Sequence, residues 1–497
     1  MWGIKLNLNI NKNYFGKVFF LIGVLIFIVM IFSPLNNLVI HIDEFFTLAV
    51  IKFSIGDIIK ININDVHPPL YYLILKVITK VLTSLNIQYN TLFVLKMVSI
   101  IPYGLILLFS ATKLQKEYGW LTVGIFVLSL ACLSEFFMYF IIARMYSFGL
   151  LFLLISFYAY KNILESSDKK SWVLFTVFSV LGAYTHYFVA ISSLVLYLML
   201  FIFVLKNKES FKVEIRKYIL SVISGIILYA PWVLSLFNQM DYVQKYFWIK
   251  DLTLNDFIQC LSFFATGNEL LIIEIVAILS LIFFIVVLFK QYDDFDNNEN
   301  YFILSGFCVF IGTILLGTIL SIIYKPILIT RYLIPASAVV WLSISILVGK
   351  IKNNKLLLIS VILIVLLCVS GVNDVINSND GLLHQANHYD KVLNDVNHDA
   401  DIIIINSEYG LLEFSDYLKD ADIYTVKFGD IYGVDNKHVH EIYNFKELNS
   451  TQLSDLIENS TNKSIYFLDV GGPEKLDKFN KTQKGKFKSD LIFYKLK

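Results

Sequence analysis

The chain has 497 residues, of which 57% are hydrophobic and only 16% are charged, and its mean hydropathy is +0.66. A water-soluble domain could not hide that much apolar surface, so the composition excludes a soluble globular protein and requires long stretches that face lipid. The formal net charge of +1 gives no reason to expect a nucleic acid or another polyanion as a partner.

Apolar runs that suit membrane spans, each of which needs about 20 residues, begin near the N-terminus. The clearest are residues 18–32, 120–133, 271–289, 301–323 and 356–370. The first run is followed by Ser-Pro-Leu-Asn-Asn instead of a small-residue cleavage site, so we interpret it as a retained span and not as a signal peptide.

Basic breaks between the apolar runs predict the topology, because short loops rich in Lys and Arg stay in the cytoplasm. These breaks are the N-terminal tail and residues 113–116, 161–170, 206–217, 290 and 350–355. Placing all of them inside predicts a polytopic α-helical protein of the cell membrane with about eleven spans. Its N-terminus would be cytoplasmic and its C-terminus would lie outside.

Residues 69–85 are long enough to span, but a span there would move the later basic loops to the outer side. Their apolar residues follow a helical stripe, whereas Lys76, Lys80 and Thr83 lie off that stripe. A helix with this pattern lies in the membrane interface instead of crossing it. We therefore expect an interfacial helix at this position.

After the last apolar run the composition changes, and residues 373–497 are polar with short apolar stretches. Predicted strands at 401–406, 423–426 and 465–470 alternate with predicted helices at 411–418 and 452–458, which indicates a small extracytoplasmic α/β domain. The sequence thus predicts two domains, a transmembrane domain of residues 1–372 and this domain of residues 373–497. Its four Asn-x-Ser/Thr sequons, which chance would explain equally well, are at Asn449, Asn459, Asn462 and Asn480.

The first outer loop, residues 34–91, is long and begins with the acid pair Asp43-Glu44 just past the first span. A partly desolvated carboxylate at a membrane surface can act as a general base on an acceptor hydroxyl. The alternative is a pair of solvated loop charges.

Asp65 and His67 lie later in the same loop, before Pro68-Pro69. The two prolines preset the first turn of the expected interfacial helix. The two polar residues would then lie at the positive end of that helix, where a phosphate could bind. The alternative is an ordinary helix cap.

Arg144 interrupts an apolar stretch, and an arginine at membrane depth is a functional candidate unless it snorkels or pairs, with Glu135 as the candidate partner. Three more positions fall on the outer side under the predicted topology, namely Lys96, His186-Tyr187 and Arg331-Tyr332. Singly, each could anchor the chain at the interface. Together, two acids and several cations are what a site needs to activate a hydroxyl and hold a phosphate leaving group.

Other chemistry finds no support in the sequence. No Walker loop, Gly-x-Gly-x-x-Gly or His-Glu-x-x-His motif occurs, which argues against nucleotide binding and zinc proteolysis. The four cysteines are not spaced as a disulfide framework or a thiolate metal site. The acids present could hold a divalent cation, but no ligand set is evident.

Six pieces of sequence occur in a recognisable order: Asp43-Glu44, His67-Pro68-Pro69-Leu70-Tyr71-Tyr72, Ala143-Arg144-Met145-Tyr146, Tyr184-Thr185-His186-Tyr187-Phe188, Ala230-Pro231-Trp232 and Arg331-Tyr332-Leu333-Ile334-Pro335. They resemble the polyprenyl-phosphate-dependent membrane glycosyltransferases, which include protein O-mannosyltransferases and the aminoarabinose transferase of lipid A (glycosyltransferase family 39 and its relatives, with the GT-C fold). The resemblance covers roughly residues 15–350.

The resemblance implies an inverting transfer of sugar from a dolichyl- or undecaprenyl-phosphate donor to a hydroxyl of a protein, lipid or glycan acceptor. Asp43 would be the general base and Glu44 would support it. Arg144 and Tyr146 match the family's Arg-Met-Tyr motif, and Lys96 stands where many relatives carry an arginine that would bind phosphate. The remaining expected substrate-binding residues are Asp65, His67, His186, Tyr187, Arg331 and Tyr332.

One departure from the family concerns the residues before Arg144. Many relatives read Gln-Glu-Ala-Arg-Met-Tyr, whereas this chain has Ile141-Ile142-Ala143-Arg144. A metal-assisted or acid-paired role for the arginine is therefore not implied.

Two other functions are compatible with a polytopic membrane protein. A flippase or other transporter of lipid-linked saccharides would carry internal repeats and polar groups near the bilayer midplane, and neither is evident here. A non-catalytic scaffold that presents the outer domain would leave the residues of the first outer loop unexplained.

Overall fold

The structure is a computed structural model that describes residues 11–36, 38, 40–132, 134–206, 211–246, 249–267, 270–291, 297–405, 422–426, 446–460, 462–470, 482–488 and 491–496. The chain forms two compact units. The first unit consists of Met1–Asn36, Lys96–Trp232 and Ile249–Asn379, and the second consists of Asn37–Leu95, Val233–Trp248 and Asp380–Lys497.

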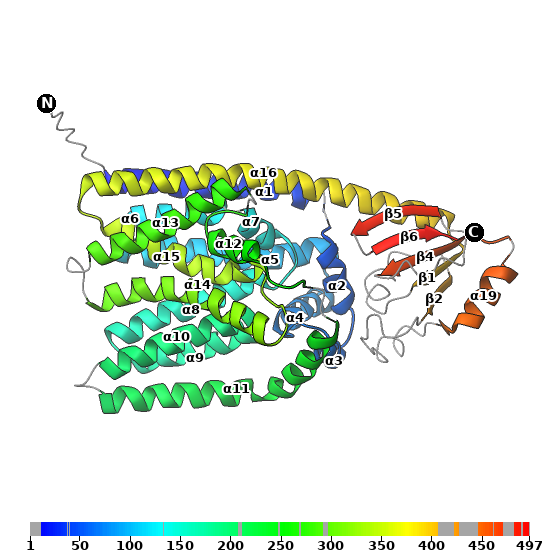
Figure 1. Cartoon of the computed structure of the whole chain (residues 1–497), viewed down its shortest axis with the longest axis horizontal. Coiled ribbons are helices and arrows are strands. Elements are labelled where there is room, and N and C mark those ends of the chain that lie inside the picture. Colours follow the sequence, from blue (N-terminus) through cyan, green and yellow to red (C-terminus); the bar gives the residue numbers. More distant parts are fainter. Residues whose placement is uncertain are drawn as a thin grey trace, which may run out of the picture. The chain divides into compact units, whose positions relative to one another are not determined.

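The first unit is a bundle of long helices that run side by side (Figure 1). Three of these helices cross the boundary between the units: α5 begins in the second unit, and α11 and α16 end in it. The helices are α1 (Lys12–Asn36), α5 (Thr91–Phe109), α6 (Gln115–Cys132), α7 (Ser134–Ile141), α8 (Tyr146–Glu165), α9 (Lys169–Ala183), α10 (Tyr187–Lys206), α11 (Phe211–Tyr246), α12 (Leu254–Ser262), α13 (Leu271–Lys290), α14 (Asn297–Ile323), α15 (Ile334–Lys350) and α16 (Asn354–Asp399), with a π turn at Ser110–Leu114 and a 3-10 turn, η3, at Thr330–Leu333.

Nine helical segments of the described chain are long and apolar enough to cross a membrane, so the chain is a multi-pass membrane protein. One of them, Thr91–Cys132, has 42 residues, and a straight helix of that length would be about twice as long as the hydrocarbon core is thick. It breaks at Gly119, whose φ of +81° is rarely adopted by residues with a side chain. The expected count of about eleven spans is reached if this segment counts twice and the 15-residue helix α9 is added.

Burial separates central from peripheral helices in the bundle. The span of α15 is 94% buried and that of α8 is 78% buried, whereas the spans of α1 and α11 are only 18% and 17% buried. The exposed side chains of the peripheral helices are large and apolar, such as Leu25 and Ile226. Because water would penalise such a surface, these faces are the ones that contact lipid.

Basic residues and their partners gather at one end of the bundle. Lys12 donates to the carbonyl oxygens of Gly349 and Ile351 at 2.8 and 2.7 Å, and Lys350 pairs with Glu299. At the same end, Lys161 forms ion pairs with Glu117 and Glu165 at 3.2 and 2.7 Å. We call this the basic end; it contains the start of α1 and the ends of α8 and α15.

Close packing of α1 on α6 depends on glycine. A Cβ added to Gly124 would overlap the backbone of Gly16, and one added to Gly16 would overlap the backbone of Trp120. Without strong hydrophobic attraction between helices in lipid, small residues that allow such close approach stabilise the pair by van der Waals contact.

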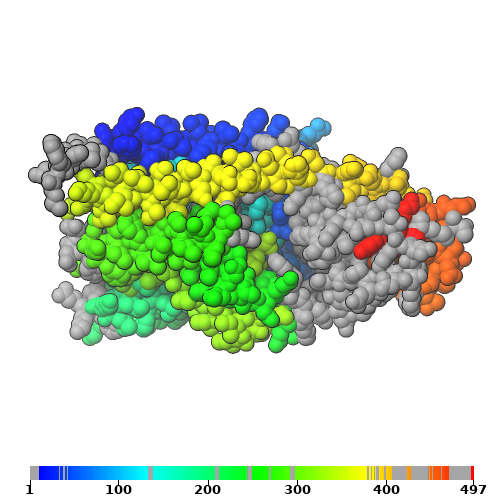
Figure 2. Space-filling view, turned by 45° about the horizontal axis from the view of Figure 1, so that its top comes forward, coloured from blue at the N-terminus to red at the C-terminus, as the bar shows by residue number. Residues whose placement is uncertain are grey.

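The helix α16 follows the same principle. A Cβ on Gly371 would overlap the carbonyl oxygen of Cys132 in α6, and the buried residues of α16 within the bundle recur at helical spacing. Its outward residues Ile359, Leu366 and Val369 are exposed. Figure 2 shows α16 as a continuous yellow ridge on the surface.

Three short helices of the second unit follow the first span: α2 (Ile42–Val50), α3 (Ile55–Asn64) and α4 (Leu70–Ser84). The rings of Phe46 in α2 and Tyr72 in α4 pack edge to face with centroids 5.7 Å apart. On α4 the tyrosines are buried, whereas Val77 and Val81 of the predicted apolar stripe are exposed. The interfacial position of this helix stays a prediction from the sequence.

The remainder of the second unit is a six-stranded sheet of order β3-β2-β1-β4-β6-β5. Its strands are β1 (Ile402–Ile405), β2 (Asp422–Val426), β3 (Lys446–Leu448), β4 (Ile465–Val470), β5 (Thr482–Lys488) and β6 (Leu491–Lys495). The pairs among β1–β4 are parallel and those that involve β6 are antiparallel. All four isoleucines of β1 are buried, as expected for a central parallel strand that is covered on both faces.

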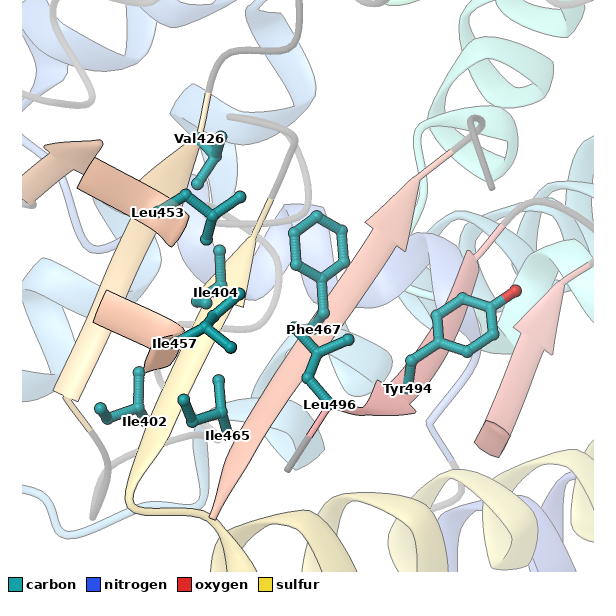
Figure 3. Close-up of a cluster of buried hydrophobic side chains, with 9 residues drawn as sticks. All are labelled: Ile402, Ile404, Val426, Leu453, Ile457, Ile465, Phe467, Tyr494 and Leu496. Carbon is teal, nitrogen blue, oxygen red and sulfur yellow. The ribbon is translucent and has the colours of Figure 1, made fainter. Parts of the chain in front are cut away.

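Figure 3 shows the core on one face of the sheet, where Leu453 and Ile457 of α19 (Ser450–Asn459) lie over Ile402 and Ile404. On the other face, the Tyr466 hydroxyl donates to Asp399 at the end of α16, at 3.4 Å. Burial raises the pKa of Tyr466 to about 12, and the neighbouring carboxylates add to the shift.

The predicted α/β character of the C-terminal region is confirmed. Strands occur at the three predicted places as β1, β2 and β4, and the predicted helix at 452–458 is α19. The predicted helix at 411–418 lies outside the described residues. The sequence missed β3, β5 and β6, because β3 and β5 are polar and β6 is a short segment near the chain end.

We expect Gly124→Val to lower the apparent melting temperature of the purified protein, because the side chain forces α1 away from α6, at a cost of about 1–3 kcal/mol. Size-exclusion chromatography after heating measures the shift at a fixed heating time. Gly104→Val is the matched control, since nothing lies within 4 Å of a Cβ at Gly104. Equal shifts in the two variants would contradict close packing of α1 on α6.

Candidate active site

Three breaks between helices of the bundle carry the motifs that the sequence singled out. Residues 142–145 separate α7 from α8, residues 184–186 separate α9 from α10, and residues 324–333 separate α14 from α15. Because α8 starts at Tyr146 and ends at Glu165 in the basic end, the break before α8 lies at the opposite end of that helix.

Aromatic rings from these breaks meet around Tyr146. Its ring centroid lies 4.4 Å from that of Tyr139, 5.2 Å from that of His186 and 6.4 Å from that of Tyr332. The rings of His186 and Tyr332 are 4.8 Å apart, and all four residues are buried. Residues that are distant in sequence therefore form one compact group.

Two arginines belong to this group. Arg144 is 4% exposed, and Arg331 lies with its guanidinium 5.9 Å from the Tyr332 ring and donates from Nη1 to the Tyr139 hydroxyl at 3.4 Å. Both arginines lie within electrostatic range of the Tyr146 hydroxyl. We call the set the arginine–tyrosine cluster; it consists of Tyr139, Arg144, Tyr146, His186, Arg331 and Tyr332.

Arginine is rare in this chain, so the meeting of two arginines in one cluster is informative. The chain has 41 basic Lys and Arg residues, of which only three, Arg144, Arg216 and Arg331, are arginines. Two of the three are in the cluster. Arginine differs from lysine in its planar fork of donors, which binds phosphate or carboxylate oxygens two at a time.

His186 has a defined hydrogen-bonding state. The residue directly precedes α10, and its Nδ1 accepts the backbone N–H of Phe188 in the first turn of that helix at 3.2 Å. A ring nitrogen that accepts carries no proton, so the neutral imidazole has its proton on Nε2. His186 is thus a hydrogen-bond donor through Nε2.

Lys96 is 1% exposed and lies near the start of α5. It is two helical turns from Tyr103 on the same face, and the Tyr103 ring packs on Phe140, with centroids 4.9 Å apart. Phe140 is next to Tyr139 of the cluster in α7. Lys96 therefore lies on the same face of α5 as Tyr103, whose ring contacts α7.

Tyr187 has another environment. Its hydroxyl accepts the indole N–H of Trp232 at 2.9 Å, and Tyr184 donates to the carbonyl of Leu228 at 3.0 Å. These bonds attach α11 to the start of α10, so the Ala230-Pro231-Trp232 piece has a packing role in this structure.

The acid pair of the first outer loop opens α2 in the second unit. His41 is the N-cap: its Nδ1 accepts the N–H of Asp43 at 3.1 Å, and the Glu44 carboxylate accepts the N–H of His41 at 2.7 Å. Glu44 is fully buried, whereas the side chain of Asp43 is 15% exposed. Of the two acids, Asp43 is thus the one whose carboxylate is open to a substrate.

Asp65 and His67 form a close pair in the same unit, with Oδ2 and Nδ1 2.8 Å apart. Asp65 ends α3, and α4 begins at Leu70 after the two buried prolines. The pair therefore precedes the start of α4, as the sequence predicted.

Lys76 of α4 stabilises the other end of α2. Its Nζ donates to the carbonyl oxygens of Ile51 and Lys52 at 2.9 and 3.3 Å, where the helix dipole favours a cation. Burial, with a smaller effect of Lys80, lowers the pKa of Lys76.

Two residues beside the candidate positions were not predicted from the sequence. Tyr139 was missed because a tyrosine in an apolar helix looks like any other core residue, and His41 because histidine is not a usual N-cap. The side chain of Glu135 lies outside the described part of the chain. Among the described residues, no three His, Cys, Asp or Glu side chains are grouped as metal ligands.

The fold of this chain is similar to that of solved structures. The chain matches the crystal structure of ArnT from Cupriavidus metallidurans in the apo state with a TM-score of 0.56 and 10% identity, over 97% of this chain and 98% of that chain. ArnT from the same organism bound to undecaprenyl phosphate matches with a TM-score of 0.52 and 9% identity, over 86% and 88%. No protein-family model and no curated protein matches. The chain thus has the ArnT-like fold that its motifs predicted.

Removal of the Lys76 ammonium should loosen α2 and the loop that carries Asp43. We expect Lys76→Met to speed hydrogen exchange of the amides of residues 42–53 by about fivefold, the effect of about 1 kcal/mol of lost capping. Mass spectrometry of the protein in nanodiscs measures the exchange. Lys80→Met, on the same helix, is the control, and the same acceleration in both variants would refute the role of Lys76.

Proposed function

We propose that the chain is a membrane glycosyltransferase that transfers a sugar from a polyprenyl-phosphate donor to an acceptor hydroxyl outside the cytoplasm. The observation that carries the proposal is the convergence of two of the three arginines with histidine and tyrosine donors at one end of the bundle. One protein of similar fold, ArnT from Cupriavidus metallidurans, has been solved bound to undecaprenyl phosphate, which is the carrier part of such a donor.

The donor phosphate is held by the arginine–tyrosine cluster. Arg144 and Arg331 supply charged, forked donors, and His186 supplies a neutral one from Nε2. Lys96, on the buried face of α5, is a further phosphate ligand. Charge-assisted hydrogen bonds of this kind stabilise the phosphate most when its bond to the sugar breaks, which lowers the barrier to transfer.

Asp43 is the general base of the reaction. Its carboxylate takes the proton of the acceptor hydroxyl while the hydroxyl oxygen attacks the anomeric carbon of the sugar. The bond from that carbon to the phosphate oxygen breaks, and the electron pair leaves with the polyprenyl phosphate. Attack opposite the leaving group inverts the anomeric configuration.

Glu44 supports the base and does not replace it. Its carboxylate is buried and accepts the N–H of His41, which fixes the first turn of α2. Asp65 and His67 form an aspartate–histidine pair in the same loop, and Tyr146 and Tyr332 line the cluster beside the phosphate. Tyr187 acts by fixing Trp232 against α10.

The proposed orientation follows from the distribution of basic residues. The basic end of the bundle is the cytoplasmic end, because lysine-rich ends stay inside. The breaks that carry the arginine–tyrosine cluster then open to the outside, with the first outer loop and the C-terminal α/β domain on that side. The helix α4 lies in the outer interface through its exposed apolar stripe.

Asp43→Asn should lower the rate of sugar transfer by about 10²–10⁴-fold, the usual contribution of a general base. Membranes that contain the variant are incubated with a panel of radiolabelled undecaprenyl-phosphate and dolichyl-phosphate sugars, and labelled products are counted. Asp57→Asn is the matched control, since Asp57 is also an acid in the first turn of a loop helix, α3. Unimpaired transfer by Asp43→Asn would remove Asp43 from the mechanism.

Arg331→Lys should weaken binding of undecaprenyl phosphate by about tenfold or more, because the charge remains but the forked donor is lost. Binding to the protein in nanodiscs is measured by microscale thermophoresis with a short-chain polyprenyl phosphate. Arg216→Lys, at the exposed arginine of α11, leaves the affinity unchanged. If both variants bind like the unmodified chain, the cluster does not hold the phosphate.

A further inference from the structure

Histidine is an unusual residue to begin a helix. Ser, Thr, Asp and Asn are the preferred N-caps, and the neighbouring helix α3 has such a cap, Ser54, which accepts the N–H of Asp57. At α2 the cap is His41, two residues before the proposed base Asp43. The sequence thus places a group that gains a proton between about pH 5 and 8 at a position where Ser would serve the helix equally well.

The geometry of His41 gives its two protonation states opposite effects on Asp43. When the ring is neutral, Nδ1 accepts the backbone N–H of Asp43 at 3.1 Å, and the carboxylate of Asp43 is not needed by the cap. The same Nδ1 lies 3.9 Å from the Asp43 carboxylate oxygen Oδ2. A protonated Nδ1 cannot accept an N–H, but it can donate to a carboxylate after a small rotation of the ring.

We propose that His41 is a positioning residue that controls Asp43 through its own protonation, an inference that rests on the proposed function. Neutral His41 fixes the first turn of α2 and leaves the carboxylate of Asp43 ready to accept the proton of the acceptor hydroxyl. Protonated His41 releases the turn and pairs with that carboxylate, which then cannot take a second proton at the same oxygen. Transfer is therefore switched off as the pH of the outer compartment falls.

The charged groups on the segments around α2 have contacts of their own in the structure. Asp57 of α3 accepts the Ser54 hydroxyl at 2.6 Å and lies 3.8 Å from Lys60. In the following loop and in α4, Asp65 pairs with His67, and Lys76 donates to the end of α2 opposite His41. Glu44 accepts the backbone N–H of His41 at 2.7 Å, and this bond does not depend on the protonation of the ring.

Asparagine separates the capping role from the proton-dependent role. Asn at position 41 can accept the Asp43 N–H as a preferred N-cap, but it does not titrate. In the unmodified chain, we expect kcat for sugar transfer to fall by roughly tenfold for each pH unit below the titration of His41. We expect His41→Asn to keep the rate seen at pH 8 and to lose this fall in kcat at low pH, which we call the acidic limb. His41→Ala lacks a cap and is expected to be about fivefold slower at every pH.

The matched control is Ser54→Ala, which removes the cap of α3. It is expected to lower the melting temperature of the protein without changing the pH dependence of transfer, because Ser54 has no titratable ring. The substrate is the radiolabelled undecaprenyl-phosphate sugar that gives product with the unmodified chain. An acidic limb that persists unchanged in His41→Asn overturns the proposal, since the limb then belongs to the donor or to another residue.

A second measurement needs no sugar donor. The ring 15N spectrum of histidine-labelled protein in nanodiscs, compared with that of His41→Asn, assigns the His41 signals. We expect the Nε2–H tautomer at pH 8 and loss of the unprotonated Nδ1 signal on acidification. If this change occurs but no polyprenyl-phosphate sugar is transferred, the proposed function fails while the His41 switch stands. If transfer occurs and Nδ1 is protonated at pH 8, the switch fails and the transferase stands.

Discussion

Unpaired backbone groups are too costly to expose to lipid, and this constraint explains where the polar residues of the bundle lie. A helix can end at membrane depth only where protein or water covers the free N–H and C=O groups. In this chain three helix endings, at residues 142–145, 184–186 and 324–333, come together at one end of the bundle, where Arg144, His186 and Tyr332 are buried by protein. Each ending brings one polar motif with it. The arginine–tyrosine cluster is thus a consequence of how the helices end as well as of which residues they carry.

Lysine and arginine occur in different places in this protein. Lysine supplies the contacts of the basic end, where a compact charge that donates to carbonyl oxygens or pairs with a glutamate is sufficient. Arginine is nearly absent from the chain, yet two of its three copies lie in the cluster. A buried arginine is costly to desolvate, and its presence in the cluster supports the proposed phosphate ligand, which a forked donor suits better than an ammonium group.

The acids of the first outer loop are organised by helix capping. Glu44 and His41 exchange hydrogen bonds with the backbone at the start of α2, and Lys76 donates to the carbonyl oxygens of the two residues that follow the helix. A helix of only nine residues would fray without such partners. Because both ends are fixed, Asp43 is held on a rigid support, and this rigidity suits the role of general base that we propose for it.

The sequence by itself determined the membrane class, the strands at three places of the C-terminal domain and the positions of the helix breaks, because hydropathy, turn residues and lysine-rich loops act over a few neighbouring residues. It also named most members of the arginine–tyrosine cluster. Only the tertiary structure decided which of these polar residues meet. It joined Tyr139 to Arg331 across the bundle, turned Tyr187 toward Trp232 and buried Glu44 beside His41. Such contacts depend on how distant helices pack, and no local pattern encodes that packing.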